Sequence, residues 1–284
     1  MKYVLSVLLL TITIGFSQSN PQELSFDTKY YNAVDKWIAF PKKATDTSYI
    51  FGFIYLDDTA GFTFNYESKF IETDSGLKKL PRKIEAGLKS RLVETTTDVA
   101  VLSDSQLTQL ELPKFPEWLS VYKADSTKVS YLKNIGYHYN HVGANNLALN
   151  PLKKAYVLDP HYAGLEFELA YAYNALHDFN QAILILQEAI KNDPNNFLFY
   201  RELGFSLKNI GQNENAEKIY KKGINLTDDK FQKSEMAINM AQSYYLEKNL
   251  KKFKEWAVIT RKFTENDSRF DQFLKIWEKE LKIN

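Results

Sequence analysis

The second half of the chain repeats itself at an interval of 34 residues, and this periodicity constrains the fold more than any other feature. The dipeptide Asp159-Pro160 recurs as Asp193-Pro194, 34 positions later. A period of roughly 20 to 50 residues is typical of architectures in which similar units stack side by side. We therefore expect residues 129–284 to form a helical repeat domain. Five further sets of residues keep the same interval: Gly136, Ala170 and Gly204; Tyr139, Tyr173 and Leu207; Gly143, His177 and Gly211; Ala148, Ala182 and Ala216; and Ala155, Ala189 and Gly223.

The residue types at these positions fit pairs of closely packed α-helices. Small residues at the Gly136 and Ala148 positions let two helix backbones approach each other. The Tyr139 and Leu152 positions fill the space between the helices. The Gly143 position lies between them, where a residue that is free to adopt positive φ ends the first helix. Each unit is therefore predicted to be a helix, a tight turn and a second helix, which a proline then stops.

On these residues the chain resembles the tetratricopeptide repeat family. The resemblance implies an all-α solenoid of about four helix pairs that binds other proteins and has no enzymatic activity or cofactor. It is clear in three units and weaker in a fourth, where Ala241, Tyr244 and Phe253 fit after a three-residue insertion and the turn Glu247-Lys248-Asn249-Leu250 lacks glycine. The four units are residues 129–162, 163–196, 197–230 and about 234–266.

A last amphipathic helix is expected from Ser268 to Lys282. Its apolar face would cover the end of the stack, as a terminal cap does in solenoids. The residues on that face are Phe270, Phe273, Leu274, Trp277 and Leu281.

The resemblance also implies which side chains line the concave face of the solenoid. Aromatic rings give a large contact area and asparagine can hold peptide groups, so we expect this face to bind an extended or helical segment of another protein. Alternatively, some of these aromatics pack between repeats. Leu198 and Glu202 stand where some family members grip a C-terminal carboxylate with Lys and Arg, so that grip is not expected. The expected groove residues are Lys133, Tyr137, Asn140, His141, Phe167, Tyr171, Asn174, Arg201, Phe205, Lys208, Asn209 and Tyr245, together with Ile238 and Gln242.

The first unit departs from the pattern at Pro151, within its second helix. Proline inside a helix removes a backbone hydrogen bond and favours a kink. Equally, the helix can begin later, with Asn150 as its N-cap and Pro151 in its first turn.

Residues 18–112 show the patterns of a small α+β domain. Tyr49–Leu56 is predicted to be a strand that is apolar on both faces, and a turn at 57–61 returns the chain as a second strand. In that second strand we expect Phe62, Phe64 and Tyr66 to point inward and Thr63, Asn65 and Glu67 to point outward.

Further elements are expected after this hairpin. Leu80, Ile84, Leu88 and Leu92 recur at helical spacing after Gly76, with Pro81 suited to a first turn, which predicts a helix with a basic outer face. Residues 98–102 predict a third strand, and Ser103 or Asp104 is expected to cap a short helix that runs to Leu110. Residues 113–128 are predicted to be a linker with an entry helix, since Leu112–Pro116 breaks any helix.

Residues 1–17 have the pattern of a secretory signal peptide. Lys2 precedes an apolar run from Val4 to Phe16, and the small residues Gly15 and Ser17 stand before a cleavage position at Gln18. The run is shorter than a membrane span of about 20 residues. We therefore expect export to the periplasm, or secretion, with another envelope protein as partner and no integral membrane segment after cleavage. An uncleaved anchor or a buried N-terminal strand is the alternative.

Composition excludes several classes of function. The chain has 36 Lys+Arg against 35 Asp+Glu and no cysteine, which argues against nucleic-acid binding and excludes thiol chemistry and disulfides. His138 and His141 have a spacing that could bind a metal, but no carboxylate completes a site, so no metal is expected. A peripheral membrane contact through the basic residues between Lys78 and Arg91 remains open. The alternative function is small-molecule or glycan binding, or unrecognised catalysis, by residues 18–112 with the repeats as a docking arm.

Overall fold

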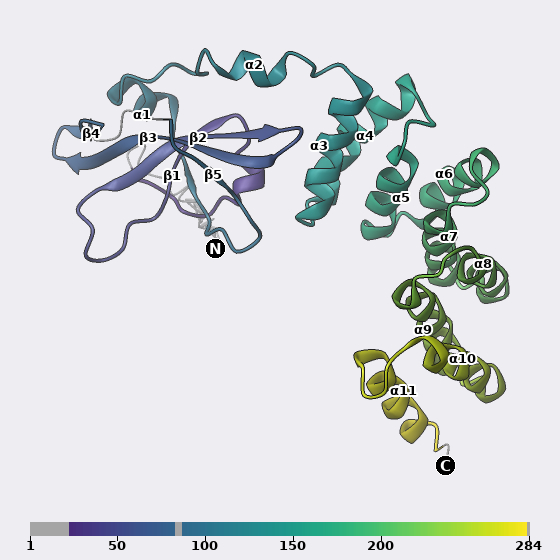
Figure 1. Ribbon diagram of the computed structural model, residues 1–284. Helices are drawn as coiled ribbons and strands as arrows, with labels where there is room; N and C mark the ends of the chain where they lie inside the picture. The colour runs from purple at the N-terminus through teal and green to yellow at the C-terminus, as the bar shows by residue number, and fades with distance from the viewer. Residues whose placement is uncertain (1–22, 83–86, 283–284) are drawn as a thin grey trace, which may run out of the picture. The chain divides into compact units, whose positions relative to one another are not determined.

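The computed structural model describes residues 23–82 and 87–282 of the chain, coloured from the N-terminus to the C-terminus in Figure 1. Backbone proximity divides the chain into two compact units. The first unit comprises the described residues of Met1–Ile54, Asn65–Leu88 and Thr97–Pro116, and the second comprises Tyr55–Phe64, Lys89–Thr96 and the described residues of Glu117–Asn284. The expected signal peptide lies outside the described residues.

The N-terminal part of the chain contains a β-sheet whose strands differ in length. Their order in the sheet is β4-β3-β2-β1-β6, with β5 paired to β3. Strand β1 pairs with β2 and with β6, and β3 pairs with β4, all in the antiparallel sense. The strands are β1 (Lys36–Ala39), β2 (Tyr49–Asp57), β3 (Gly61–Thr73), β4 (Gly76–Lys79), β5 (Lys89–Arg91) and β6 (Ala100–Val101).

Large apolar side chains form the core of the first unit. Phe51, Phe53 and Phe70 are fully buried. The Trp37 ring packs edge-on against Phe53 with centroids 5.2 Å apart, and its Nε1 donates to the Pro113 carbonyl at 2.7 Å. This packing, together with helix α1 (Asp104–Gln109), confirms an α+β fold for this part of the chain.

Several sequence predictions for this region are confirmed. The hairpin of β2 and β3 forms around the predicted turn, and β6 lies within the predicted third strand. Ser103 caps α1 by accepting a hydrogen bond from the Gln106 backbone, while the Gln106 side chain accepts from the Ser103 backbone.

Two predictions for this region are wrong. The residues expected to form a helix after Gly76 instead include strands β4 and β5; residues 83–86 of that stretch lie outside the described residues. Apolar residues four apart share one face in a strand as well as in a helix, and pairing with β3 decided between the two. Thr63 was expected to face outward but is only 1% exposed, because its hydroxyl donates to the Gly61 carbonyl and accepts from the Arg91 guanidinium.

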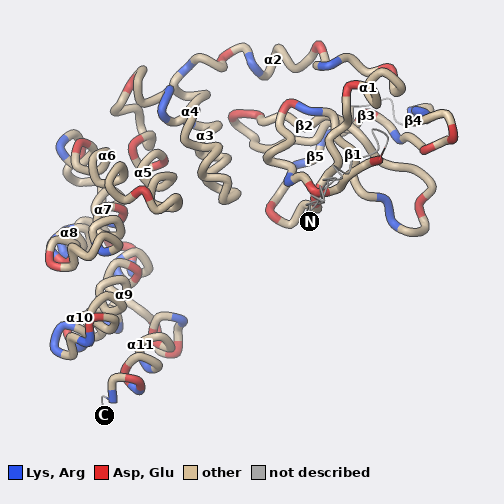
Figure 2. Tube along the Cα trace, turned by 180° about the vertical axis from the view of Figure 1, so that it is seen from behind, with Lys and Arg blue, Asp and Glu red and all other residues tan. Residues whose placement is uncertain are grey.

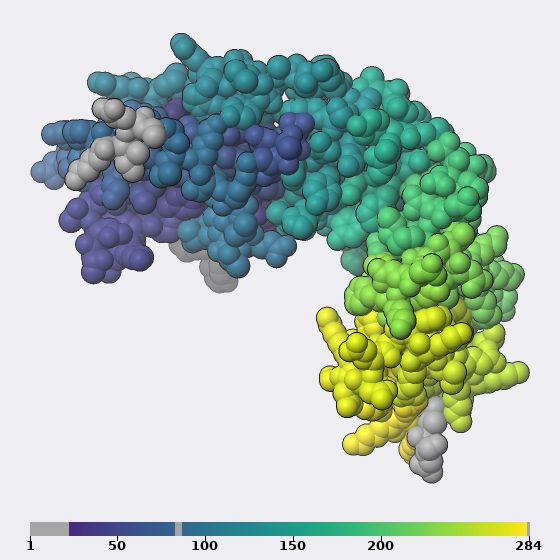
Figure 3. All heavy atoms as spheres, in the orientation of Figure 1, coloured from purple at the N-terminus to yellow at the C-terminus, as the bar shows by residue number. Residues whose placement is uncertain are grey.

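The second unit consists mainly of antiparallel helix pairs that stack in sequence order, from α3 to α11 in Figure 1. Figure 3 shows the same helices as closely packed atoms. A single apolar core runs through them from Ala148 to Leu274. The helices are α2 (Leu119–Lys123), α3 (Val129–His141), α4 (Asn145–Leu158), α5 (Leu165–Ala175), α6 (Phe179–Asn192), α7 (Phe197–Asn209), α8 (Asn213–Leu226), α9 (Lys230–Leu246), α10 (Leu250–Phe263) and α11 (Arg269–Glu280).

The turn inside each pair has the backbone conformation that the repeat predicts. Gly143 and Gly211 have φ values of 72° and 78°. The equivalent residues His177 and Lys248 adopt φ values of 61° and 57° although they are not glycine. Lys248 falls at this position only after the predicted three-residue insertion, which accordingly lies in the long helix α9.

Helix α11 closes the stack as the sequence predicts. Ser268 caps it by accepting from the Asp271 backbone, and Leu274 is fully buried against the preceding helices. Phe270, Trp277 and Leu281 pack partly buried against the same core.

Pro151 lies inside α4 rather than at its start, because the helix begins at Asn145. Proline has no N–H to donate to the carbonyl four residues earlier, so α4 contains a missing backbone hydrogen bond. We expect Pro151→Ala to stabilise the helical unit by about 1 kcal/mol, since alanine restores the donor and has the best helix propensity. Urea unfolding followed by far-ultraviolet circular dichroism measures this, with Asn150→Ala at the neighbouring exposed position as control. A loss of stability in Pro151→Ala would contradict the expectation.

Candidate partner-binding groove

The residues expected to form the groove lie on α3, α5, α7 and α9, the first helices of the four pairs. Their exposure differs widely. Tyr137 and Tyr171 are 41% and 39% exposed, which is high for aromatic side chains, whereas Asn140 and Asn174 are each only 4% exposed. His141 and Asn209 are exposed, and the others that were expected to bind are half-buried: Lys133, Phe167, Arg201, Phe205, Lys208 and Tyr245. Ile238 is buried and Gln242 half-buried.

Two adjoining hollows bring most of these side chains together. The first has a volume of about 200 Å³ and is lined by Tyr137, Asn140, His141, Phe167, Glu168 and Tyr171. The second, of about 340 Å³, is lined by Tyr171, Asn174, Ala175, His177, Arg201, Glu202, Phe205, Glu235 and Asn239. Tyr171 lines both hollows, so the two adjoin at this side chain, and together they are called the groove. Lys133, Lys208, Asn209 and Tyr245 line neither hollow.

The two buried asparagines connect neighbouring repeats instead of facing a partner. Asn140 Nδ2 on α3 donates to the backbone carbonyl and to the carboxylate Oε2 of Glu168 on α5, both at 2.9 Å. Asn174 on α5 makes the same contacts with Glu202 on α7, at 3.3 and 3.0 Å. Because these amide groups are already engaged, we correct the expectation that they hold a partner's peptide groups.

Lys208 takes the equivalent place in the third repeat. Its Nζ donates to Gln242 Oε1 at 3.0 Å and lies 3.4 Å from Asn239 Oδ1, both on α9. Burial lowers the pKa of Lys208 below its usual value. Lys208 therefore links α7 to α9. Because α9 contains the inserted residues, Lys208 and Asn239 are further apart in the sequence than Asn174 and Glu202.

Arg201 is held firmly within the groove. Its guanidinium donates to Glu202 Oε1 at 2.9 Å and to Gln232 Oε1 at 2.7 Å, and it lies 5.5 Å from the Phe167 ring centroid. Glu235 is a further carboxylate, 3.7 Å away. The chain itself therefore supplies a cation to the carboxylates of the second hollow.

Sequence reasoning did not predict the carboxylates of the groove floor: Glu168 was not singled out, and Glu202 was considered only as a residue that argues against a carboxylate grip. A signal was present, since these residues are separated by the repeat interval of 34 positions. Burial raises the pKa of Glu168, while the hydrogen bond from Asn140 and the charge of Lys133 act in the opposite direction. The floor of the first hollow is thus the carboxylate of Glu168, which is largely removed from water.

The remaining groove candidates have partners of their own. The Tyr245 ring stacks on Trp277 with centroids 5.3 Å apart, and its hydroxyl donates to Glu280 on α11. Asn209 Nδ2 donates to the Phe205 carbonyl in its own helix at 2.8 Å. These contacts place Tyr245 and Asn209 at the margin of the groove.

The histidines considered as metal ligands have other surroundings. His138 Nε2 lies 2.9 Å from the Asp58 carbonyl oxygen, and burial lowers the pKa of the ring. His141 stacks on Tyr137 with centroids 5.9 Å apart. Over residues 23–82 and 87–282, no three side chains of His, Cys, Asp or Glu come together as a metal site.

The charges differ between two of the second helices. Helix α8 carries both Lys and Glu, whereas α10 carries Lys and Arg with Glu255 as its one acidic residue (Figure 2). Within the part of the chain that the structure describes, no helix combines the length and apolar character needed to cross a bilayer.

Comparison with known proteins agrees with the repeat architecture. The family model described as tetratricopeptide repeat matches residues 185–218. No curated protein matches the chain. Among solved structures, the chain is similar to TTC0263, a thermophilic TPR protein of Thermus thermophilus, with 19% identity, a TM-score of 0.45 and coverage of 64% of this chain and 91% of that one.

Two other solved structures show a comparable similarity. YrrB, described as a TPR protein with an unusual peptide-binding site, has 18% identity and a TM-score of 0.48, with coverage of 56% of this chain and 80% of that one. MamA has 24% identity and a TM-score of 0.43, with coverage of 57% and 85%.

The helix pairs and the positive-φ turns agree with the family match. The tetratricopeptide repeat model matches residues 185–218, and the helix pairs on either side, from α3 to α10, share the same turn conformation; α11 follows them as a terminal helix.

Proposed function

We propose that this chain is an exported interaction scaffold that binds a segment of another protein in the groove over α3, α5 and α7. The observation that carries the proposal is the groove made of the two adjoining hollows, with Tyr137 and Tyr171 exposed at its edge. Aromatic side chains are enriched where proteins bind one another, because they bury a large area at a small cost in side-chain entropy.

The rigidity of the groove favours this function. Each groove helix is joined to the next through buried hydrogen bonds, such as those from Asn140 to Glu168 and from Asn174 to Glu202. A surface that is already ordered loses little conformational entropy when a partner binds. The entropic cost of binding would therefore come mainly from ordering the partner segment.

The proposal includes export, because residues 1–17 have the pattern of a signal peptide. If the chain is exported, the expected partner is another envelope protein. N-terminal sequencing of the chain purified from its native cells tests this point. We expect the mature chain to begin at Gln18; a chain that retains Met1 and stays in the cytoplasm would contradict export.

Changing Tyr137, Phe167, Tyr171 and Phe205 together to alanine is expected to abolish partner binding, because it removes the rings along both hollows. The test is affinity capture from an extract of the native envelope, with mass spectrometry of the recovered proteins. The matched control changes four exposed apolar residues that line neither hollow to serine: Val157, Leu184, Val258 and Phe115.

Circular dichroism must first show that both variants keep their helices. The proposal is supported when a partner is recovered by the natural chain and by the control but is lost with the groove variant. Recovery of the same partner by all three chains would place binding elsewhere on the molecule.

A further inference from the structure

The two carboxylates of the groove floor are equivalent by repeat but differ in their partners. Glu202 has both oxygens engaged: Oε2 accepts from Asn174 and Oε1 accepts from the Arg201 guanidinium. Glu168 Oε2 accepts from Asn140 in the same way. Among the described residues, however, no donor is found for Glu168 Oε1 and no cation lies within 4 Å of this carboxylate.

The reason for the difference lies in one position of the repeat. Arg201 precedes Glu202, whereas the equivalent residue before Glu168, 34 positions earlier, is Phe167. The first repeat pair therefore has the carboxylate without the cation. Beside this carboxylate the structure has the hollow of about 200 Å³.

The surroundings of Glu168 attract a cation. The residue is only 9% exposed, and a carboxylate removed from water is costly unless a cation compensates for it. The rings of Tyr137, Phe167 and Tyr171 line the same hollow, and the faces of aromatic rings attract cations. Phe167 and Tyr171 lie with their centroids 6.2 Å apart.

We propose that the hollow over Glu168 is the subsite for an arginine side chain of the partner segment. The guanidinium would pair with Glu168 and stack among the rings, as the chain's own Arg201 does with Glu202 and the Phe167 ring. Arginine fits better than lysine because its planar head can stack and donate at the same time. The proposal rests on the proposed function, which supplies the partner segment.

The nearest competitor within the chain is Lys133 on α3. Its Nζ lies 5.8 Å from the Tyr137 ring centroid, and its charge acts on Glu168 from a distance. If the Lys133 side chain were the natural occupant of the subsite, replacing Lys133 would destabilise the subsite or leave its side chains disordered. As a like charge beside an incoming guanidinium, it should instead weaken binding slightly.

The test is a titration of the full chain with the tripeptide acetyl-Gly-Arg-Gly-amide, followed through the NMR signals of labelled tyrosine and phenylalanine rings. The matched neutral probe carries citrulline in place of arginine, and a third probe carries lysine. We expect shifts at Tyr137, Phe167 and Tyr171, at least tenfold weaker binding of the citrulline probe, and severalfold weaker binding of the lysine probe.

Variants separate the carboxylate from the rings. Glu168→Gln keeps an oxygen that can accept from Asn140. We expect it to weaken binding of the arginine probe about tenfold or more. Tyr137→Ala removes a ring at the exposed edge of the groove and leaves the Asn140 hydrogen bond in place. We expect it to weaken binding of the arginine probe severalfold. Lys133→Met is expected to bind the arginine probe as well as the natural chain or better.

Equal binding of the arginine and citrulline probes, or an unchanged affinity in both Glu168→Gln and Tyr137→Ala, would overturn the subsite. Equal binding of the lysine probe would overturn the assignment to arginine. The experiments distinguish a failure of the subsite from a failure of the proposed function. A partner whose capture depends on the groove but is insensitive to Glu168→Gln refutes the subsite alone, whereas specific binding of the arginine probe without any groove-dependent partner refutes the proposed function alone.

Discussion

Replacing Gly204 by alanine is expected to destabilise the helical unit by about 2 kcal/mol, although alanine is the better helix former. A Cβ atom at this position would lie 2.5, 2.6 and 2.7 Å from three ring atoms of Tyr220 on α8. Tyr220 is completely buried, so its ring has no space into which to move. Overpacking of this kind costs about 1–3 kcal/mol, and the gain in helix propensity returns only about 1 kcal/mol.

The repeat itself suggests how the clash can be relieved. In the preceding unit Ala170 and Leu186, both fully buried, occupy the positions of Gly204 and Tyr220. We expect Gly204→Ala to cost at least about 1 kcal/mol less in a Tyr220→Leu background than in the natural chain, since contacting residues couple.

Urea unfolding of the four chains in this double-mutant cycle, followed by far-ultraviolet circular dichroism, measures the coupling. Gly87→Ala serves as the control, because among the described residues, its chain neighbours aside, no atom lies within 4 Å of the Cβ it would add. Additive effects of the two substitutions would show that the Tyr220 ring does not explain the glycine.

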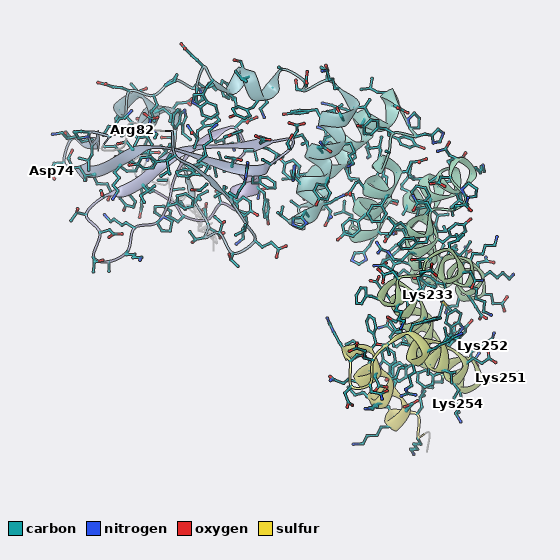
Figure 4. The ribbon with its side chains drawn as sticks, viewed as in Figure 1. Asp74, Arg82, Lys233, Lys251, Lys252 and Lys254 are labelled. Atoms are coloured by element: carbon teal, nitrogen blue, oxygen red, sulfur yellow. The ribbon has the colours of Figure 1, made fainter. Side chains whose placement is uncertain are left out.

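Lowering the pH from 7 to 3 is expected to destabilise the C-terminal helices through Glu217 on α8. Lys221 and Lys252 donate to its Oε1 at 2.6 and 2.9 Å, and the Tyr244 hydroxyl donates to its other oxygen. Burial alone would raise the pKa of Glu217, but these donors outweigh burial and lower the pKa to about 2. Lys252 projects from α10 beside Lys251 and Lys254 (Figure 4), so this carboxylate joins three helices.

The direction of the pH effect follows from linkage. The folded-state pKa of Glu217 is depressed below its ordinary value of 4.5, so its contribution is complete above about pH 5 and is lost as the pH falls toward 2. With part of the interaction exposed to solvent, we expect about 1–2 kcal/mol of this contribution to be lost at pH 3. Asp271, whose pKa the Arg261 guanidinium lowers to about 2, adds a smaller loss over the same range.

Unfolding measured between pH 7 and pH 3 checks this expectation in the natural chain, Glu217→Gln and Asp271→Asn. Each variant should be less stable at pH 7 and should depend less on pH. Glu188→Gln, which removes an exposed carboxylate, is the control and should follow the natural chain. A Glu217→Gln chain as pH-sensitive as the natural one would contradict the role given to Glu217.

The repeat domain could be predicted well because its constraints are local and recur. The turn at Gly143 needs positive φ, and the same conformation at His177 and Lys248 shows that the interval marks a backbone requirement rather than a residue type. Small residues such as Gly204 were predicted to permit close helix packing, and the Tyr220 ring confirms it.

The groove was predicted only in part. Family positions indicated the exposed rings of Tyr137 and Tyr171, but Asn140 and Asn174 are buried in contacts that cross from one repeat to the next. A polar residue on a helix face can meet solvent or the neighbouring helix, and the helical period does not distinguish these cases. Only the stacking of the repeats shows that the amides are engaged and that Glu168 has an oxygen free of protein donors among the described residues.

By itself, the sequence determined the presence and the spacing of the repeats, because the interval, the turn residues and the apolar faces are properties of the chain itself. The tertiary structure alone decided that Gly76–Lys79 and Lys89–Arg91 are strands, since pairing with β3 satisfies their backbone groups. It also decided that Arg201 neutralises Glu202 while Glu168 lies in an open hollow. Those outcomes depend on which side chains face each other across separate helices, and no local pattern contains that information.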